Sequence, residues 1–466
     1  MRSSAASDVY KRQLYDRQPE KINHNTLLEL VIDLYEAGDY AQGITLAEKW
    51  VKQQNVSRQE DIYPLVYYYI AYGYQNLHRK ENTEQANCYM TMYVTLGENA
   101  AADGCFPHRT EDYIVLKSLA EEYHLAMAYY YLGCLLYDRR VYDESIEDYE
   151  ESILRSPDFP TVHRNLALAY YNVKKLPQRA YEEMEKAFAL DETDARVYLE
   201  LDQLKKRLNV AVKERWSDME KHFDLVESRD DLYLEYVTLL NTLGEPEKAL
   251  GLIKARKFHQ WEGGEGKVAA QYLTALYQLA KAAVEKEDYA EAKELLLRAV
   301  GEYPHNLGEG KLESGQENNL YYLLGLVQEK LGEAKDAFES LTRACCGESE
   351  PVGMMYYNDQ PPEMIYYQGL AYRMLGEEEQ AVRRFQKLVD YGREHIGDEI
   401  KIDYFAVSLP DLLIFEENLN ERNRKHCLFM MSLGLRGLGQ TDEAKACAEE
   451  LLSMDNAHQG IRVHDL

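Results

Sequence analysis

Residues 321–344 read YYLLGLVQEKLGEAKDAFESLTRA, and this stretch decides the fold. Apolar residues recur in it at the three- and four-residue spacing of an α-helix, on both sides of the turn KLGE at 330–333. Gly325 and Ala337 stand 12 residues apart, and Leu341 follows one helical turn later. Because small residues let two helices approach closely, the stretch predicts a helical hairpin.

The same 12-residue interval between small residues recurs along the chain. The other pairs are Gly133 and Ser145, Ala280 and Ala292, Gly369 and Ala381, and Ser432 and Ala444. Each second member is followed four residues later by an aromatic residue, Leu or Ala, which can fill the space beside the contact. Turns containing Gly or Asp interrupt the helical pattern at 36–40, 286–289, 374–377 and 437–440. We therefore expect an all-α chain of stacked hairpins.

A second, longer period gives these hairpins a family resemblance. Residues 129–157 open with Y-x-x-L-G at Tyr129 and close at Pro157, and Gly133 lies 34 residues before Ala167. This pattern resembles the tetratricopeptide repeat (TPR), a helix–turn–helix unit of 34 residues. The resemblance implies a right-handed α-solenoid of TPR-like helical hairpins, in which each unit is buried by its neighbours, and a role in binding.

We expect three parts along the chain. Residues 1–13, MRSSAASDVYKRQ, lack the apolar period and are expected to be a non-native or disordered leader. Residues 14–229 would form N-terminal TPR-like repeats with an insertion near 97–112. Residues 230–466 would form C-terminal TPR repeats with an irregular insertion near 392–411, which either covers a neighbouring repeat or binds a partner.

Composition limits the partners and the compartment. The chain has 53 Lys and Arg against 81 Asp and Glu, a net charge of −28, which argues against nucleic-acid or anionic-membrane partners. No apolar run is long enough for a transmembrane helix, and no signal peptide follows Met1. The 7 Cys lack C-x-x-C or zinc spacing, which fits a reducing compartment. These features predict a cytoplasmic protein.

No catalytic motif stands out in the sequence. There is no H-E-x-x-H, no G-x-S-x-G and no local Cys/His signature, and the abundant carboxylates fall on solvated helix faces. We therefore expect no enzyme activity, no metal site and no cofactor.

The 39 Tyr are the unusual feature of the composition, and they cluster on the first helix of several hairpins. Adjacent helical residues point about 100° apart, so one Tyr of a pair can pack while the next faces the concave groove. The groove candidates by register are Tyr130, Tyr137, Tyr171, Tyr277, Tyr322 and Tyr366. The alternative is that most of these rings pack between repeats with hydroxyls at the rim.

The tetrapeptide GEGK occurs twice, at 264–267 and 308–311. It is not a phosphate-binding loop, because Trp261 and His305 stand where that motif requires a glycine. One interpretation is a structural turn, in which Gly supplies positive φ and Lys reaches a helix C-terminal carbonyl. The other is a recognition edge for a neighbouring domain or ligand. The edge-binding candidates are Trp261, Lys267 and Lys311.

Three segments carry a narrower resemblance. FHQWEGGEGK at 258–267, NLGEGK at 306–311 and KIDYFAVSLPDLL at 401–413 resemble the C-terminal repeat region of large bacterial proteins. Those proteins carry an uncharacterised β-rich N-terminal domain resembling sugar-processing folds, so the resemblance implies that this chain is part of a longer polypeptide.

Three functions follow from these patterns. The leading one is a non-catalytic scaffold that binds a protein or peptide partner, or an upstream domain of the same polypeptide, through its concave groove and loop edge. The alternative is the accessory half of a carbohydrate-active enzyme, in which the repeats help to form a glycan site and the catalytic domain is absent from this chain. A structural spacer is the third.

Overall fold

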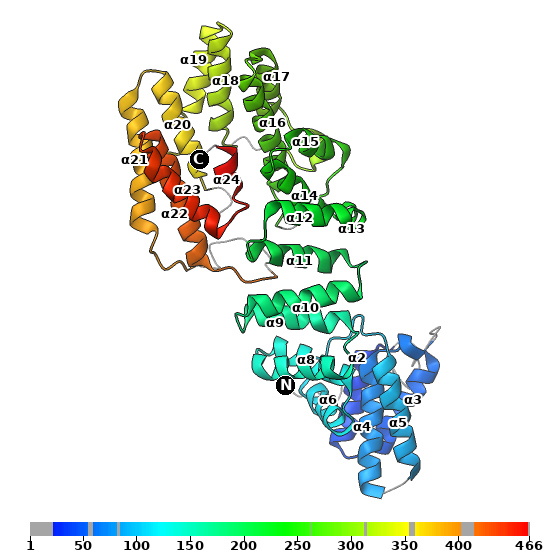
Figure 1. The fold of residues 1–466 in the computed structure, drawn as a ribbon. Helices are drawn as coiled ribbons and strands as arrows, with labels where there is room; N and C mark the ends of the chain where they lie inside the picture. The colour runs from blue at the N-terminus through cyan, green and yellow to red at the C-terminus, as the bar shows by residue number, and fades with distance from the viewer. Residues whose placement is uncertain are drawn as a thin grey trace, which may run out of the picture. The chain divides into compact units, whose positions relative to one another are not determined.

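The structure is a computed structural model that describes residues 22–54, 59–81, 84–261, 263–311, 315–353, 359–401 and 414–464. All regular structure in these ranges is helical, which confirms the predicted all-α fold of hairpins. The chain divides into two compact units, Met1–Asp191 and Glu192–Leu466, and each is described by itself (Figure 1). The expected leader, 1–13, lies outside the described residues.

Unit 1 is built of helices that pack against their neighbours in sequence. They are α2 (His24–Glu36), α3 (Tyr40–Gln53), the 3-10 helix η2 (Gln59–Asp61), α4 (Pro64–Glu81), α5 (Glu84–Asn99), α6 (Thr110–Tyr123), α7 (Ala126–Asp138), α8 (Tyr142–Arg155), α9 (Pro160–Asn172) and α10 (Pro177–Leu190).

Unit 2 is also built of helices that pack against their neighbours in sequence, and the lengths of the α-helices among them vary more, from 5 residues in α24 to 19 in α16. They are α11 (Ala195–Arg207), α12 (Val212–Lys221), α13 (Phe223–Ser228), α14 (Asp230–Thr242), α15 (Pro246–Ala255), α16 (Lys267–Glu285), α17 (Tyr289–Val300), the 3-10 helix η3 (His305–Leu307), α18 (Asn318–Lys330), α19 (Ala334–Ala344), α20 (Pro362–Met374), α21 (Glu378–His395), α22 (Leu419–Gly437), α23 (Thr441–Met454) and α24 (Gln459–Val463).

The 12-residue interval marks the closest approach of the two helices in a hairpin. Ser145 Oγ donates a hydrogen bond of 2.7 Å to the Gly133 carbonyl, which joins α8 to α7. A Cβ added to Gly133 would lie 2.6 Å from ring atoms of Tyr149, and one added to Gly325 would lie 2.7 Å from Leu341. The small residues therefore make room for the bulky residue that follows on the second helix, as the sequence predicts.

The breaker turns lie where the sequence places them. The helices flanking 286–289, 330–333, 374–377 and 437–440 end and begin within one residue of these turns. Each turn reverses the chain through a residue with positive φ, such as Gly332 at 79° and Gly376 at 81°. Glycine reaches this region without the steric penalty that a Cβ imposes, so the helices stop at defined positions.

The first helices of unit 2 explain where the chain divides. Arg215 on α12 is 1% exposed and donates to Asp202 on α11, with Nε at 3.0 Å and Nη2 at 2.6 Å from the carboxylate oxygens. Its Nη2 also donates to Glu235 on α14 at 2.7 Å. This buried ion network ties α11 and α12 to α14, so the compact boundary lies at 191/192, before the expected boundary at 229/230.

The helices set the limits of the two expected insertions differently from the sequence pattern. Helix α5 continues through Asn99 and α6 begins at Thr110, so the first non-helical connection is 100–109. Helix α21 continues through His395, so 392–395 are helical, and α22 begins only at Leu419. Gly392 lies against Met431 on α22, where it permits close packing of the two helices. The remainder of the second insertion, 402–411, lies outside the described residues.

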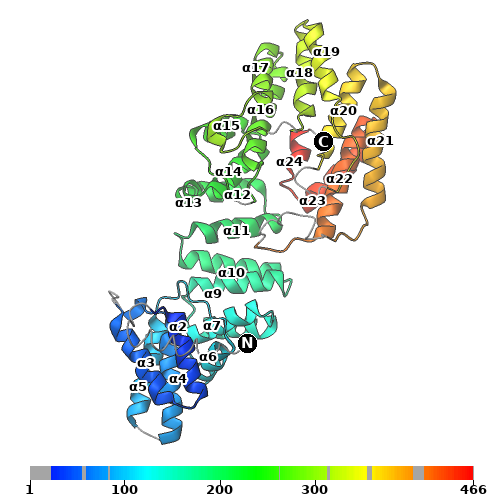
Figure 2. The same ribbon diagram turned by 180° about the vertical axis from the view of Figure 1, so that it is seen from behind.

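The end of unit 2 returns to its first helix. Asn456 Nδ2 donates to the Asn209 carbonyl at 2.6 Å, although the two residues are 247 positions apart. Arg207 on α11 donates to the Phe415 carbonyl at 3.3 Å. In Figures 1 and 2 the helices of unit 2 follow a curve, and α24 lies inside it from both sides. An open solenoid has contacts only between neighbouring repeats, so this return is a departure from the expected pattern.

Candidate interaction site

The two GEGK copies lie side by side, and side chains of the second copy make hydrogen bonds to neighbouring helices. The Phe258 amide donates to the Asn306 carbonyl at 2.8 Å and joins the two loops. Glu309 of the second copy accepts hydrogen bonds from the amides of Gly266 and Ala269, both at 2.7 Å. Gly266 is the N-cap of α16 and Ala269 lies in its first turn. Glu309 therefore satisfies donors that have no partner within that helix and places a negative charge at its N-terminus.

The lysine of the second copy is also used internally. Lys311 Nζ donates to the Val300 carbonyl, at the C-terminus of α17, at 2.6 Å and to Glu317 at 2.8 Å. Its side chain is only 18% exposed. These are the contacts that the structural-turn interpretation predicts for the second copy.

The first copy does not repeat these contacts. The side chains of Glu265 and Lys267 are exposed, and neither makes a hydrogen bond or ion pair with any residue that the structure describes. Trp261 lies half-buried beside them, and its ring lies over Gly264, where an added Cβ would collide with the indole. We call Trp261, Glu265 and Lys267 the exposed edge.

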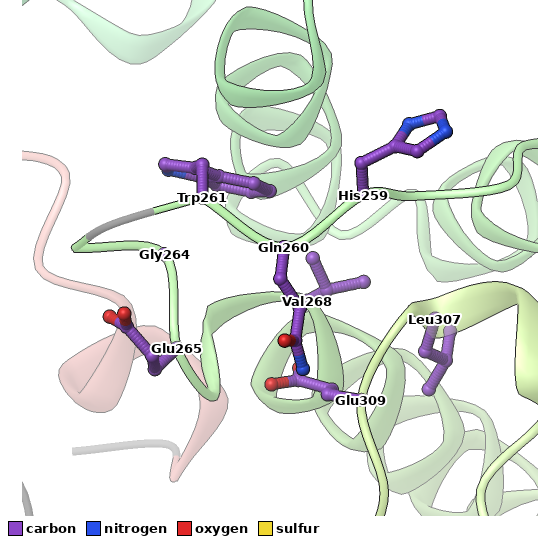
Figure 3. Close-up of a pocket in the computed structure, with 8 residues that line it drawn as sticks. All are labelled: His259, Gln260, Trp261, Gly264, Glu265, Val268, Leu307 and Glu309. Atoms are coloured by element: carbon purple, nitrogen blue, oxygen red, sulfur yellow. The ribbon is translucent and has the colours of Figure 1, made fainter.

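Two hollows flank the exposed edge. The first is lined by His259, Gln260, Trp261, Gly264, Glu265, Val268, Leu307 and Glu309. Figure 3 shows its apolar side formed by Val268 and Leu307, the Gln260 and Glu309 side chains close together, and Glu265 turned away from Glu309. The second hollow is lined by Arg229, Asp230, Asp231, His259, Gln260 and Trp261. Trp261 therefore contributes to both.

Asp230 lines the second hollow and forms an ion pair with Arg256. Burial acts to raise the pKa of this carboxyl, but the His259 amide and the Arg256 guanidinium outweigh burial and hold the pKa below its usual value. The amide donates at 2.9 Å. The carboxylate is therefore held in place in the hollow that the Trp261 ring also lines.

The three unit 1 groove candidates differ in accessibility. Tyr130 is 8% exposed, and its ring packs edge-on against Phe159 at 5.0 Å, so little of it is open to a ligand. Tyr137 is half-buried and meets Tyr142 at 5.1 Å. Tyr171, on α9, is also half-buried.

The three unit 2 candidates gather around a residue that the sequence did not single out. Tyr277 and Tyr366 are 4% and 6% exposed, whereas Tyr322 is half-buried. All three rings lie between 5.4 and 6.2 Å from the ring of Tyr367. Burial and the neighbouring Tyr277 raise the pKa of Tyr367 well above its usual value, so its hydroxyl stays protonated and can donate.

Sequence reasoning also missed the amide-bearing residues near this cluster, chiefly Asn241 and Gln271. Asn241 is fully buried on α14 and donates to the Gln271 side chain at 2.9 Å. No spacing rule singles them out, because single amides on repeat helices are ordinary. The sequence does contain one relevant signal: two apolar residues, Ile461 and Val463, follow the last repeat helix and indicate that the chain packs again after it.

Neither a metal site nor a membrane-spanning helix is found among the described residues. Among them no group of three or more His, Cys, Asp or Glu side chains could hold a metal ion. No helix in these ranges has the length and apolar character needed to cross a membrane.

Comparison with protein-family models identifies the repeats. Models described as "Tetratricopeptide repeat" match residues 130–195 and 277–351, 363–391, and 426–458. The chain contains tetratricopeptide repeats. The matched TPR segments include the hairpins at 133–152 and 321–344 from which the repeat was predicted. Proteins built of TPRs are generally non-catalytic scaffolds, and TPRs are a repeat type consistent with protein–protein interaction.

Solved TPR-containing structures resemble the chain only distantly. A tetratricopeptide repeat protein from Parabacteroides merdae is 14% identical over 65% of this chain and 98% of its own, with a TM-score of 0.25. Yeast Tom70 is 9% identical over 98% and 90%, with a TM-score of 0.31. A human IFIT1 dimer solved with PPP-AAAA is 11% identical over 97% and 95%, with a TM-score of 0.29. Similarities this low support no statement about the function of this chain.

Proposed function

We propose that this protein is a non-catalytic TPR scaffold that docks a protein partner on its exposed edge. The observation that carries the proposal is the difference between the two GEGK copies. Glu309 and Lys311 are engaged within the fold, whereas Glu265 and Lys267 are exposed and make no polar contact with the described residues. Trp261 beside them supplies the large, rigid aromatic surface that commonly anchors protein interfaces.

The charge of the chain supports a basic partner. The net charge is −28, and complementary charge speeds encounter and selects among partners. Glu265 provides an acidic group in the first hollow beside Trp261, and Asp230, paired with Arg256, lines the second. Lys267 adds a positive charge that restricts the orientation of the partner. A short segment that packs an apolar residue against the Trp261 ring and carries flanking basic residues fits this arrangement.

Half-buried tyrosines extend the proposal to the repeat helices. Tyr137, Tyr171 and Tyr322 keep part of their surface open and are proposed as secondary contacts for the same partner class. The low exposure of Tyr130, Tyr277 and Tyr366 supports packing as their main role in this conformation.

A peptide array tests the proposal. The full chain is applied to a library of basic and apolar peptides, with a glycan array in parallel. We expect peptide binding, and the Trp261→Ala variant should weaken it at least tenfold because the anchor is lost. Lys267→Glu should change which peptides bind.

The matched control is Lys335→Glu, an exposed lysine on α19 whose replacement changes the charge in the same way away from the edge. It should leave binding unchanged. If Trp261→Ala does not change peptide binding, the exposed edge is not the binding site. Binding to glycans alone would favour the accessory role in a carbohydrate-active enzyme.

A further inference from the structure

After α23 ends at Met454, the chain turns inward and crosses other helices of its own unit. We call residues 455–464 the C-terminal segment. Figures 1 and 2 place its helix, α24, inside the curve of unit 2, and α24 contacts α14. We call the side chains beneath the segment, Asn241, Gln271, Tyr277, Lys281 and Tyr367, the receiving surface.

The segment is fastened at its start by an asparagine pair. The Asn456 amide N–H donates to Asn209 Oδ1 at 2.8 Å, and Asn456 Nδ2 donates to the Asn209 carbonyl at 2.6 Å. In return, Asn209 Nδ2 donates to the Ser453 carbonyl at 3.0 Å. Asn209 has a φ of 58° in the turn after α11, a conformation that Asn tolerates better than most residues. This fastening lies outside the receiving surface.

The side-chain amide of Gln271 binds the next part of the segment at Gln459. Gln459 and Gln271 exchange hydrogen bonds of 3.1 and 3.0 Å through their side-chain amides. Asn241 orients Gln271, because Asn241 Nδ2 donates to the Gln271 backbone carbonyl at 3.0 Å and to Gln271 Oε1 at 2.9 Å. The Oδ1 atom of buried Asn241 and the Oε1 atom of Gln278 accept no hydrogen bond from the described residues. The surface thus has acceptor capacity beyond what the segment uses.

The end of the segment is held by its backbone and by two apolar side chains. Lys281 Nζ donates to the Val463 carbonyl at 2.9 Å. Ile461 and Val463 are 2% and 6% exposed, so their side chains are almost fully removed from water. The end of the segment is therefore held by one backbone contact and by the burial of two aliphatic side chains.

A chain of hydroxyl groups completes the surface. Tyr277 and Tyr367 share a hydrogen bond of 2.6 Å between their hydroxyls, and the Tyr367 hydroxyl lies 2.9 Å from His464 Nδ1. The imidazole ring centre is 5.4 Å from that of Tyr367. The ring of His464 therefore contacts the aromatic cluster in which the groove candidates Tyr277, Tyr322 and Tyr366 surround Tyr367.

We infer that the C-terminal segment is an intramolecular ligand, and that a partner peptide carrying the same side chains displaces it from the receiving surface. This inference rests on the proposed scaffold function but uses a different surface from the exposed edge. The contacts specify the peptide: a Gln, an aliphatic residue two positions later, a second aliphatic residue after two more, and then His.

The segment differs from the repeat hairpins in a way that permits displacement. The hairpins interlock through a small residue under a ring, as at Gly133 and Tyr149. The segment instead uses side-chain amides, one lysine and two aliphatic side chains, and a peptide can supply equivalent groups. Because the segment is tethered, it competes at an effective concentration of about a millimolar, which weakens binding of any free peptide to the intact chain.

Binding of a labelled synthetic peptide with the sequence of residues 455–464 tests the inference. The proteins are the full wild-type chain and a full chain carrying Ile461→Asp and Val463→Asp, which weakens the segment and leaves the receiving surface unchanged. We expect the peptide to bind the variant at least tenfold more tightly than the wild type. Equal affinities, or no binding to either protein, would overturn the inference.

Two controls define the surface. Adding Gln271→Ala to the variant should weaken peptide binding at least tenfold, and a peptide with Asp in place of both aliphatic residues should not bind. Trp261→Ala should leave this binding unchanged, so failure at the exposed edge and failure at the receiving surface give different results.

Hydrogen exchange on the wild-type chain covers the case in which the variant does not fold. We expect amides of 459–464 to exchange at least tenfold faster than those of α22, and excess unlabelled peptide to speed them further while α16 stays protected. Exchange as slow as α22 with no response to the peptide would mean that the segment is a permanent part of the fold. If light scattering shows a dimer and the peptide dissociates it, the receiving surface binds a second copy of the chain. That result would overturn the assignment to a partner peptide.

Discussion

At the scale of single residues, hairpin packing depends on side chains too small to obstruct a neighbour. Ala337 is 4% exposed, and its backbone carbonyl lies 3.3 Å from the point where a Cβ on Gly325 would stand. Leu341, one turn later, occupies the space that Gly325 leaves open. The pattern of small and large residues therefore indicates where the two helices of a hairpin approach each other closely.

Replacing Ala337 by Leu tests this reading. The added carbons have no free volume between α18 and α19, so the free energy of unfolding should fall by about 1–3 kcal/mol. Phe338→Leu is the matched control, because Phe338 is next in sequence but 62% exposed, and its effect should stay within about 0.5 kcal/mol. Chemical denaturation measures both, and equal effects would show that Ala337 is not at an interface.

At the scale of elements, helix ends are held by residues distant in sequence. Helix α16 begins in the first GEGK copy, yet its first turn is capped by Glu309 of the second copy, 40 to 43 positions later. The buried network of Arg215, Asp202 and Glu235 likewise joins three helices. These contacts fix the relative positions of elements that the repeat pattern leaves unspecified.

The duplicated tetrapeptide allows a matched comparison of capping. Glu309→Ala removes two acceptors at the N-terminus of α16 and should lower the free energy of unfolding by about 0.5–2 kcal/mol. Glu265→Ala makes the same change in the first copy, where the carboxylate has no described partner, and should have an effect within about 0.5 kcal/mol. Denaturation of the two variants side by side measures the difference, and a larger loss for Glu265→Ala would contradict the assignment.

The ion network predicts a loss of stability in acid. Burial acts to raise the pKa of Glu235, but Lys206 and Arg215 outweigh it and lower the pKa from 4.5 to about 2. A carboxyl whose folded pKa is lowered stabilises the fold above its unfolded pKa, and that contribution disappears as the pH falls from about 4.5 towards 2. Burial raises the pKa of the neighbouring Asp202, which opposes part of this effect.

Glu235→Gln isolates the contribution of Glu235. Its stability should fall less steeply than that of the wild type between pH 5 and pH 3, measured by denaturation at each pH. Parallel slopes for the two proteins would indicate that Glu235 is not held in its ionised form by the network.

At the scale of the whole molecule, the chain consists of two compact units with separate internal contacts. The groove candidates are divided between them, with Tyr130, Tyr137 and Tyr171 in unit 1 and the other three in unit 2. The exposed edge and the receiving surface both belong to unit 2, so the candidate binding functions concentrate there.

Hydrogen exchange should report this division. Arg215→Met leaves Asp202 buried without its partner, a change that costs about 3–5 kcal/mol in proteins generally, and should speed exchange in residues 192–464 more than in 22–191. Gly133→Val places side-chain atoms against Tyr149 and should show the opposite distribution. Uniform acceleration across both units by either variant would indicate a single cooperative unit.

The sequence by itself determined the hairpins and their turns. These features depend on contacts between residues close in the chain or one repeat apart, and such contacts leave a period that can be read directly. Gly133 and Ser145, which meet at 12 positions, are an example.

Only the tertiary structure decided which groups remain available to a ligand. The two GEGK copies are identical in sequence, and their different roles come from where Val300 and the first turn of α16 lie. The C-terminal segment reaches Gln271 across 188 positions and Asn209 across 247, without any repeating spacing. Contacts of that range depend on how the helices of the unit curve together, which no local pattern encodes.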